Sequence, residues 1–281
     1  DLSKWKGKNV VWYGDSMVAQ GNPSTNGYTS NETGFGYYAE LEHGFNSIYR
    51  GVGGQAFKRN TNTWYANEDG SYAGRYGSNG LTEPPEGTTT HLGYFSSWDR
   101  ITASIPQNQR FAIDLVIING GHNDFDSVED VPTDGVITAS EPIWEPNSTK
   151  DYDWNQHPLY LQGDYNIDTF TGAVASCIMK WQVWCPNAIV VLVTPFPRWD
   201  LNTKQQLKSN NLTFRQLCEI ELQTAKYMNT EIIDANAKCN INIHNFESCT
   251  QTDDIHPNED GRKLYGRTLI TELYNIYPKI I

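Results

Sequence analysis

The sequence is poor in positive charge and has no long hydrophobic run. Its 21 Lys and Arg residues are outnumbered by 33 Asp and Glu residues, which gives a net charge of −12. Nucleic acids and anionic membrane surfaces attract positively charged proteins, so this balance argues against both as general partners. No apolar segment reaches the length of a transmembrane helix. We expect a small molecule or a glycan as the partner instead.

Cysteine is scarce, and its odd number prevents complete pairing within one chain. The five cysteines are Cys177, Cys185, Cys218, Cys239 and Cys249. No two of them have the CxxC spacing of a zinc site, and the histidines lack the spacing of metal ligands, so the sequence predicts no metal site. Cys239 and Cys249 are candidates for a disulfide, although a sequence does not reveal the separation of their Cα atoms. The chain also starts at Asp1 rather than at Met, from which we expect a processed or excised piece.

Four short apolar runs predict strands, and each run ends in residues suited to turns or to chemistry. They cover residues 10–13, 47–49, 115–118 and 189–193, and a shorter fifth run covers 231–234. Their apolar residues are continuous rather than alternating, which is typical of parallel strands buried on both faces.

Helical patterns lie between and after these strands. Residues 170–184 form one, and residues 214–228 form a second, in which Glu221 interrupts an apolar face. The last helical face is formed by Tyr265, Leu269, Leu273 and Ile276. Alternating strands and helices predict a single α/β domain over residues 1–281, an open sandwich with a mostly parallel sheet.

Two long stretches, residues 56–98 and 125–168, do not fit this alternation. They are rich in Gly, Asn, Asp, Pro and aromatic residues and are poorly periodic. Both follow strand ends, where ligands bind in open α/β sheets. Because long loops in compact domains are usually functional or disordered, we interpret both stretches as walls of a substrate cleft.

A serine, a histidine and an acid stand at predicted strand or helix ends. Ser16 directly follows the first strand, where a turn into a helix exposes its hydroxyl group. Asp253 lies three residues before His256, just ahead of the last helix. In a non-helical turn, this spacing lets the carboxylate bind one imidazole nitrogen while the other nitrogen faces Ser16. A hydrolytic serine needs such a base and such an orienting group.

Two further segments are suited to stabilise an oxyanion. The glycine-rich residues 51–54 allow the backbone to approach a reacting carbonyl group closely. Asn123 follows the third strand and offers a neutral side-chain NH₂ donor.

Together, the segments 14–16 (Gly-Asp-Ser), 51–54 (Gly-Val-Gly-Gly), 121–124 (Gly-His-Asn-Asp) and 253–256 (Asp-Asp-Ile-His) resemble the ordered blocks of the SGNH, or GDSL-like, hydrolase family. Each segment alone occurs often by chance, but their order after strand-like runs is specific. The resemblance spans nearly the whole chain. It implies the family's flavodoxin-like, three-layer α/β/α sandwich and a serine esterase that needs no cofactor.

By this resemblance, Ser16 is the nucleophile, and His256 and Asp253 complete its triad. The backbone N–H groups of Ser16 and Gly54 and the side chain of Asn123 would form the oxyanion hole. Two assignments rest on family spacing alone. Asp254 adjoins Asp253 and is the other candidate acid, and Gly53 is the alternative to Gly54, because Arg50 precedes the cluster where the family often has a polar neutral residue.

The substrate is inferred from the loops. Trp144 and Trp154 are candidates for stacking on a sugar, and Arg198, at another strand end, is a candidate contact for an anionic group. We therefore expect a small acyl ester, such as acetyl, on a carbohydrate. Weaker similarity to SGNH domains of bacteriophage tail and surface proteins predicts an extracellular, virion or cell-surface location. The alternatives are a glycan-binding module on an inactive hydrolase fold and a lipid or thioester hydrolase.

Overall fold

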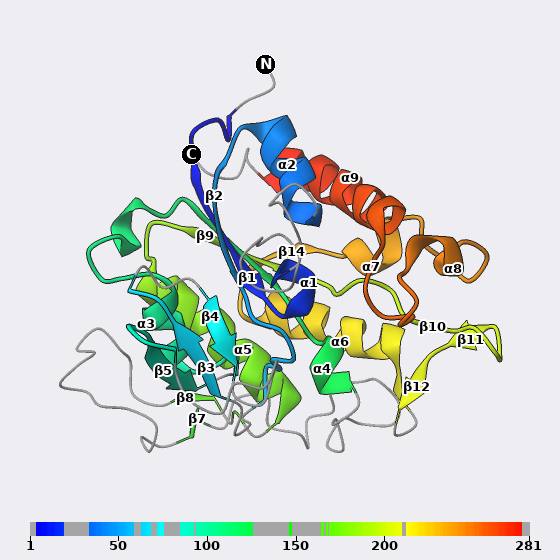
Figure 1. The fold of residues 1–281 in the computed structure, drawn as a ribbon, viewed down its shortest axis with the longest axis horizontal. Coiled ribbons are helices and arrows are strands. Elements are labelled where there is room, and N and C mark those ends of the chain that lie inside the picture. The colour runs from blue at the N-terminus through cyan, green and yellow to red at the C-terminus, as the bar shows by residue number, and fades with distance from the viewer. Residues whose placement is uncertain are drawn as a thin grey trace.

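A computed structural model of the chain contains one central parallel sheet (Figure 1). It describes residues 4–19, 34–58, 63–68, 72–75, 85–92, 94–125, 146–147, 164–165, 167, 169–209 and 212–276. The central strands are β1 (Asn9–Gly14), β2 (Asn46–Gly51), β6 (Leu115–Asn119), β9 (Ile189–Val193) and β14 (Glu231–Ile233). Their order is β14-β9-β6-β1-β2, and all neighbouring pairs are parallel. All five predicted strands are present.

Helices cover both faces of this sheet, which makes the three layers (Figure 1). One face carries α2 (Phe35–His43) and α9 (Glu259–Ile276). The other carries α3 (Trp98–Ser104), α5 (Phe170–Trp184) and α6 (Phe214–Tyr227). The three-layer α/β/α sandwich predicted from the sequence is therefore confirmed.

The alternation of side chains along β1 explains why both faces are covered. Val10 and Trp12 pack into the core beneath α2 and α9, whereas Val11 and Tyr13 pack into the core beneath α5 and α6. All four side chains are fully buried. A strand that buries both faces must be apolar at every position, which is the continuous pattern seen in the sequence.

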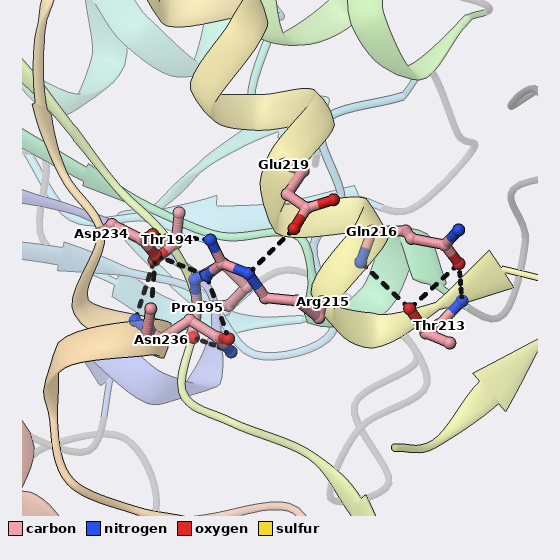
Figure 2. Close-up of polar contacts among 9 residues, drawn as sticks. Thr194, Pro195, Thr213, Arg215, Gln216, Glu219, Asp234 and Asn236 are labelled. Carbon is pink, nitrogen blue, oxygen red and sulfur yellow. Dashed lines mark hydrogen bonds and ion pairs between the residues drawn. The ribbon is translucent and has the colours of Figure 1, made fainter. Parts of the chain in front are cut away.

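Side-chain caps fix the starts of the two long helices on one face. The Thr169 hydroxyl accepts the N–H of Gly172 at the start of α5. Thr213 and Gln216 form a reciprocal capping box at the start of α6 (Figure 2). Such caps satisfy N–H groups that the first helical turn leaves unpaired.

Residues 56–98 differ from the predicted loop. They contain a three-stranded antiparallel sheet of β4 (Tyr72–Arg75), β3 (Thr63–Ala66) and β5 (Thr89–Leu92). The strands are only four residues long, too short for a reliable periodicity. Most of the other predicted insertion, residues 125–168, lies outside the described residues. There, β7 (Pro146–Asn147) pairs with β8 (Asp164–Tyr165).

The remaining elements are short. They are α1 (Ser16–Ala19), α4 (His122–Phe125), α7 (Ala235–Lys238), α8 (Phe246–Cys249) and the hairpins β10–β11 (Trp199–Asp200, Gln205–Gln206) and β12–β13 (Lys208–Ser209, Leu212–Thr213). A 3₁₀ turn covers Arg110–Ala112. None of the helices that the structure describes combines the length and the hydrophobicity needed to cross a bilayer.

The five cysteines are buried free thiols. The disulfide considered between Cys239 and Cys249 is therefore not formed. Burial raises the pKa of the Cys239 thiol to about 12, so this thiol is not reactive as a thiolate at neutral pH.

Candidate active site

The carboxyl ends of three neighbouring strands lie side by side. Gly14 of β1 pairs in register with Gly51 of β2 and with Asn119 of β6. The N–H of Val52 also donates to the carbonyl oxygen of Gly14 at 3.0 Å. Because the strands are parallel and in register, the segments that follow them share one edge of the sheet.

Ser16 begins α1 immediately after β1. The turn between them requires glycine at position 14, because a Cβ atom there would overlap the carbonyl oxygen of Asn119 and the side chain of Val18. Oδ1 of the fully buried Asp15 accepts the N–H of Met17 at 2.9 Å, which fixes the first turn. Ser16 itself is half-buried.

His256 reaches Ser16 from the far end of the sequence. Its Nε2 lies 2.8 Å from the hydroxyl oxygen of Ser16, although 240 residues separate the two. The backbone holds the histidine just ahead of α9: the N–H of Gln251 donates to the carbonyl oxygen of His256 at 2.8 Å, and Thr250 forms a β-bridge with Pro257. The imidazole of His256 is thus within proton-transfer distance of the Ser16 hydroxyl group.

Asp253, rather than Asp254, contacts the imidazole. Its Oδ2 lies 2.5 Å from Nδ1 of His256, and its Oδ1 accepts the backbone N–H groups of Ile255 and His256 at 3.0 and 2.9 Å. Partial burial raises the pKa of Asp253, but these hydrogen bonds outweigh it and hold the pKa below its ordinary value. Asp254 has a left-handed backbone, with φ of 55°, and is exposed.

The glycine segment and Asn123 reach the same edge. A Cβ atom on Gly53 would lie 3.8 Å from the Cβ of Ser16, so this residue borders the serine directly. Gly54 has φ of 73°, which favours glycine. Asn123 lies in α4, and its side-chain NH₂ donates to the carbonyl oxygen of Gln55 at 2.8 Å. An amide has two N–H donors, so this bond orients Asn123 and leaves one N–H for a ligand.

Two buried charged residues tie these segments together. Arg100, on α3, donates to the carbonyl oxygens of Gly14 and Arg50 at 2.7 and 3.0 Å and thereby joins the ends of β1 and β2. Asp124 accepts the N–H groups of Phe57 and Lys58 at 2.9 and 3.0 Å. Arg100 is not predictable from the sequence, since a single arginine next to an irregular stretch carries no recognisable pattern.

Arg198 lies beside α4, of which His122 is the first residue. The guanidinium group of Arg198 lies 5.7 and 5.9 Å from the ring centres of Phe125 and Phe214. Burial, followed by the charges of Arg198 and His256, lowers the pKa of His122 well below its ordinary value, so this imidazole is neutral. The other predicted substrate contacts, Trp144 and Trp154, lie outside the described residues.

A polar network anchors the segment that leads to Arg198 (Figure 2). Arg215 binds both carboxylate oxygens of Asp234 at 2.7 Å. Asp234 accepts a hydrogen bond from the hydroxyl group of Thr194. The oxygen of this hydroxyl group in turn accepts a hydrogen bond from the backbone N–H of Asn236 at 2.9 Å. The side chain of Asn236 donates to the carbonyl oxygen of Pro195 at 3.2 Å. The network joins the ends of β9 and β14 and fixes where the chain leaves the sheet.

Metal ligation is not indicated by this arrangement. In the part of the chain that the structure describes, no three His, Cys, Asp or Glu side chains are grouped as ligands would be. What the edge of the sheet does contain is a hydroxyl group, a base within hydrogen-bond distance of it, and nearby N–H donors. These are the groups that acyl transfer through a serine requires.

Comparisons with known proteins support the fold. No family model and no curated protein sequence matches the chain. A solved structure from Lactobacillus plantarum is 15% identical, with a TM-score of 0.57, covering 96% of this chain and 98% of that one. A lipase/acylhydrolase from Enterococcus faecalis is 13% identical (TM-score 0.51; 95% and 96% covered). A variant of an acetylxylan esterase from Geobacillus stearothermophilus is 16% identical, with a TM-score of 0.51, covering 95% of this chain and 94% of that one. The chain shares the α/β fold of these proteins along nearly its whole length.

Proposed function

We propose that this chain is an SGNH-type serine ester hydrolase, with Ser16 as nucleophile, His256 as base and Asp253 as the orienting acid. The observation that carries this function is the continuous chain of contacts from Asp253 through His256 to Ser16, at 2.5 and 2.8 Å. The four sequence blocks and the fold shared with a lipase/acylhydrolase and an acetylxylan esterase support it independently.

The reaction proceeds in two steps. The hydroxyl oxygen of Ser16 attacks the ester carbonyl carbon while Nε2 of His256 takes the proton. The Asn123 side chain and the N–H groups of Ser16 and Gly54, or Gly53, bind the oxyanion. Collapse of the intermediate expels the alcohol, which His256 protonates. Water then attacks the acyl-serine, His256 takes its proton, and the carboxylic acid leaves with Ser16 restored.

Asp253 holds the imidazole in the tautomer that this reaction needs. The carboxylate binds Nδ1–H, which leaves Nε2 free to accept the serine proton. Its lowered pKa keeps it ionised at neutral pH, where it stabilises the imidazolium that forms.

For the substrate, we propose a small acyl ester, such as acetyl, on a carbohydrate. The acidic chain, its aromatic-rich polar segments and the shared fold of an acetylxylan esterase favour it. The shared fold of a lipase/acylhydrolase makes a longer acyl chain the second candidate. We propose that Arg198, whose guanidinium group lies beside Phe125 of α4, contacts an anionic group of the sugar.

Hydrolysis of p-nitrophenyl acetate, butyrate and octanoate by the native chain and by Ser16→Ala tests the proposal. We expect the acetate to be cleaved fastest and turnover to fall by roughly a million-fold in the folded variant. Faster cleavage of the octanoate would favour a lipid or thioester hydrolase. Activity unchanged by Ser16→Ala would show that Ser16 is not the nucleophile, and the absence of activity from the native chain would leave a glycan-binding module as the better explanation.

A further inference from the structure

Glu221 is a fully buried acid on α6 that the reaction described above does not use. Its side chain is 0% exposed. Neither of its carboxyl oxygens has a hydrogen-bond partner among the residues that the structure describes. Glutamate is almost never fully buried unless it is paired, because a buried, unpaired carboxylate costs several kcal/mol. A residue kept in this position therefore needs a separate explanation.

The carboxyl group of Glu221 packs against the backbone that leads to Asn123. A Cβ atom on Gly121 would overlap its Oε1, and Gly121 has φ of 106°, a conformation that favours glycine. Leu217, one turn earlier on α6, lies 3.6 Å from the same Cβ position, and the tilted ring of Phe214 has its centre 4.9 Å from that of the His122 ring. One face of α6 therefore supports residues 121–122, immediately before Asn123.

The surroundings of Glu221 favour the uncharged acid. Burial raises its pKa well above the ordinary value, and the charges of Asp124 on α4, Asp15 after β1 and Asp234 after β14 raise it further. Tyr265, on α9 at the opposite face of the sheet, also interacts with Glu221, and burial raises the pKa of this tyrosine. Two cations of the region are bound elsewhere, Arg100 to Gly14 and Arg50, and Arg215 to Asp234.

Two buried acceptors at this edge of the sheet also lack a donor in the described part of the chain. Oδ2 of Asp15 and Oδ1 of Asn119 are buried and have no donor among the described residues. The side-chain NH₂ of Asn119 is already bound to Val193 and Tyr265. A protonated carboxyl group has one O–H donor, whereas a carboxylate has none.

We propose, on the basis of the proposed function, that Glu221 is a positioning residue: in its uncharged form it supports Gly121 and so holds the side chain of Asn123 where an oxyanion forms. Its shape and its O–H group matter, and a negative charge does not. Because Asn123 acts on the oxyanion, a displaced Asn123 lowers kcat while KM for a small ester changes little.

The test compares Glu221→Gln and Glu221→Ala with Glu219→Ala, which removes a half-exposed acid from the same helix. Using p-nitrophenyl acetate below the melting temperature of each variant, we expect Glu221→Gln and Glu219→Ala to keep kcat within about threefold. We expect Glu221→Ala to lower kcat by about 10- to 100-fold at nearly constant KM, less than complete loss of one oxyanion donor.

Wild-type kcat in folded Glu221→Ala, with only a lower melting temperature, would show a purely structural role and overturn the inference. Equal loss in Glu221→Gln and Glu221→Ala would show that the charge is required and would also overturn it. Ser16→Ala, assayed in parallel, separates the two proposals. If the native chain shows turnover that depends on Ser16 and Glu221→Ala keeps its kcat, only the role proposed for Glu221 is wrong. If the native chain shows no such turnover, the proposed hydrolase function is wrong, and so is the role of Glu221.

A second measurement does not depend on activity or on the folding of Glu221→Ala. The infrared difference spectrum between the native chain and Glu221→Gln at neutral pH should contain the carbonyl band of a protonated carboxylic acid. A carboxylate band in its place would contradict the uncharged state.

Discussion

Asp253 holds its own turn through three contacts: its carboxylate oxygens contact the Nδ1 atom and the backbone N–H of His256 and the backbone N–H of Ile255. The tight turn thus fixes both the position and the tautomer of the base. We expect Asp253→Asn to lower kcat by about 10³- to 10⁴-fold with little change in folding, because the amide cannot select the required tautomer.

Asp254→Asn is the matched control for this change, since it alters the neighbouring carboxylate in the same turn. It should leave kcat within about threefold, because Asp254 is exposed and Asp253 makes the contact with the imidazole. A large loss in Asp254→Asn with little loss in Asp253→Asn would reverse the assignment of the acid.

The oxyanion donors can be separated by kinetics. Asn123→Ala should lower kcat by about 10²- to 10³-fold at nearly unchanged KM, because its donor acts on charge that develops in the transition state. Gly53→Ala and Gly54→Ala keep the backbone N–H, so a lower kcat in either variant would report a displaced donor rather than a removed one. Position 54 has φ of 73°, so Gly54→Ala should also lower the melting temperature. An unchanged kcat in Asn123→Ala would exclude this residue from the oxyanion hole.

Asp15 should make stability depend on pH. Burial, with a contribution from Asp124, raises its pKa to about 7. The native state therefore binds a proton that the unfolded state releases near pH 4. The stabilisation of the folded state by this bound proton is complete below that pH and is lost as the pH rises through about 7. Relative to the native chain, Asp15→Asn should gain stability across this window, on the order of 4 kcal/mol. Urea unfolding at a series of pH values measures it, and a pH-independent difference between the two chains would refute the assignment.

Arg100 should be essential for stability at the edge of the sheet. Its removal in Arg100→Leu leaves the buried carbonyl oxygens of Gly14 and Arg50 without this donor, and we expect a loss of about 2–4 kcal/mol. Arg198→Leu is a comparison of the same type, at an arginine that lies beside Phe125 of α4. Equal stability of Arg100→Leu and the native chain in urea unfolding would show that the two contacts contribute nothing.

The sequence predicts the local part of this structure well. Short apolar runs identify the five central strands, and the runs are continuous in the inner strands β1, β6 and β9, which bury both faces. The helix 170–184 and the buried face of Tyr265 and Leu269 follow from the 3.6-residue period in the same way. The segments that carry Ser16 and His256 are recognisable because their chemistry depends on residue types at fixed strand ends.

The remaining features depend on contacts between distant segments, which a single sequence does not encode as a pattern. Arg100 joins Gly14 to Arg50, and the strand β3 has a partner on each side within residues 63–92. Glu221 was visible only as an interruption of an apolar face, without its contact with Gly121. The stacking role expected for Trp144 and Trp154 and the extracellular or surface location both stay predictions.

The identity of the nucleophile can be tested by covalent labelling. Diethyl p-nitrophenyl phosphate transfers its diethyl phosphoryl group to an activated serine oxygen and releases p-nitrophenolate. Incubation of the native chain with this reagent, followed by peptide mass spectrometry, should find one adduct, on Ser16, with much slower labelling in His256→Ala and none at this position in Ser16→Ala. An adduct on another residue, or no adduct on the folded native chain, would contradict the assignment of Ser16 as the nucleophile activated by His256.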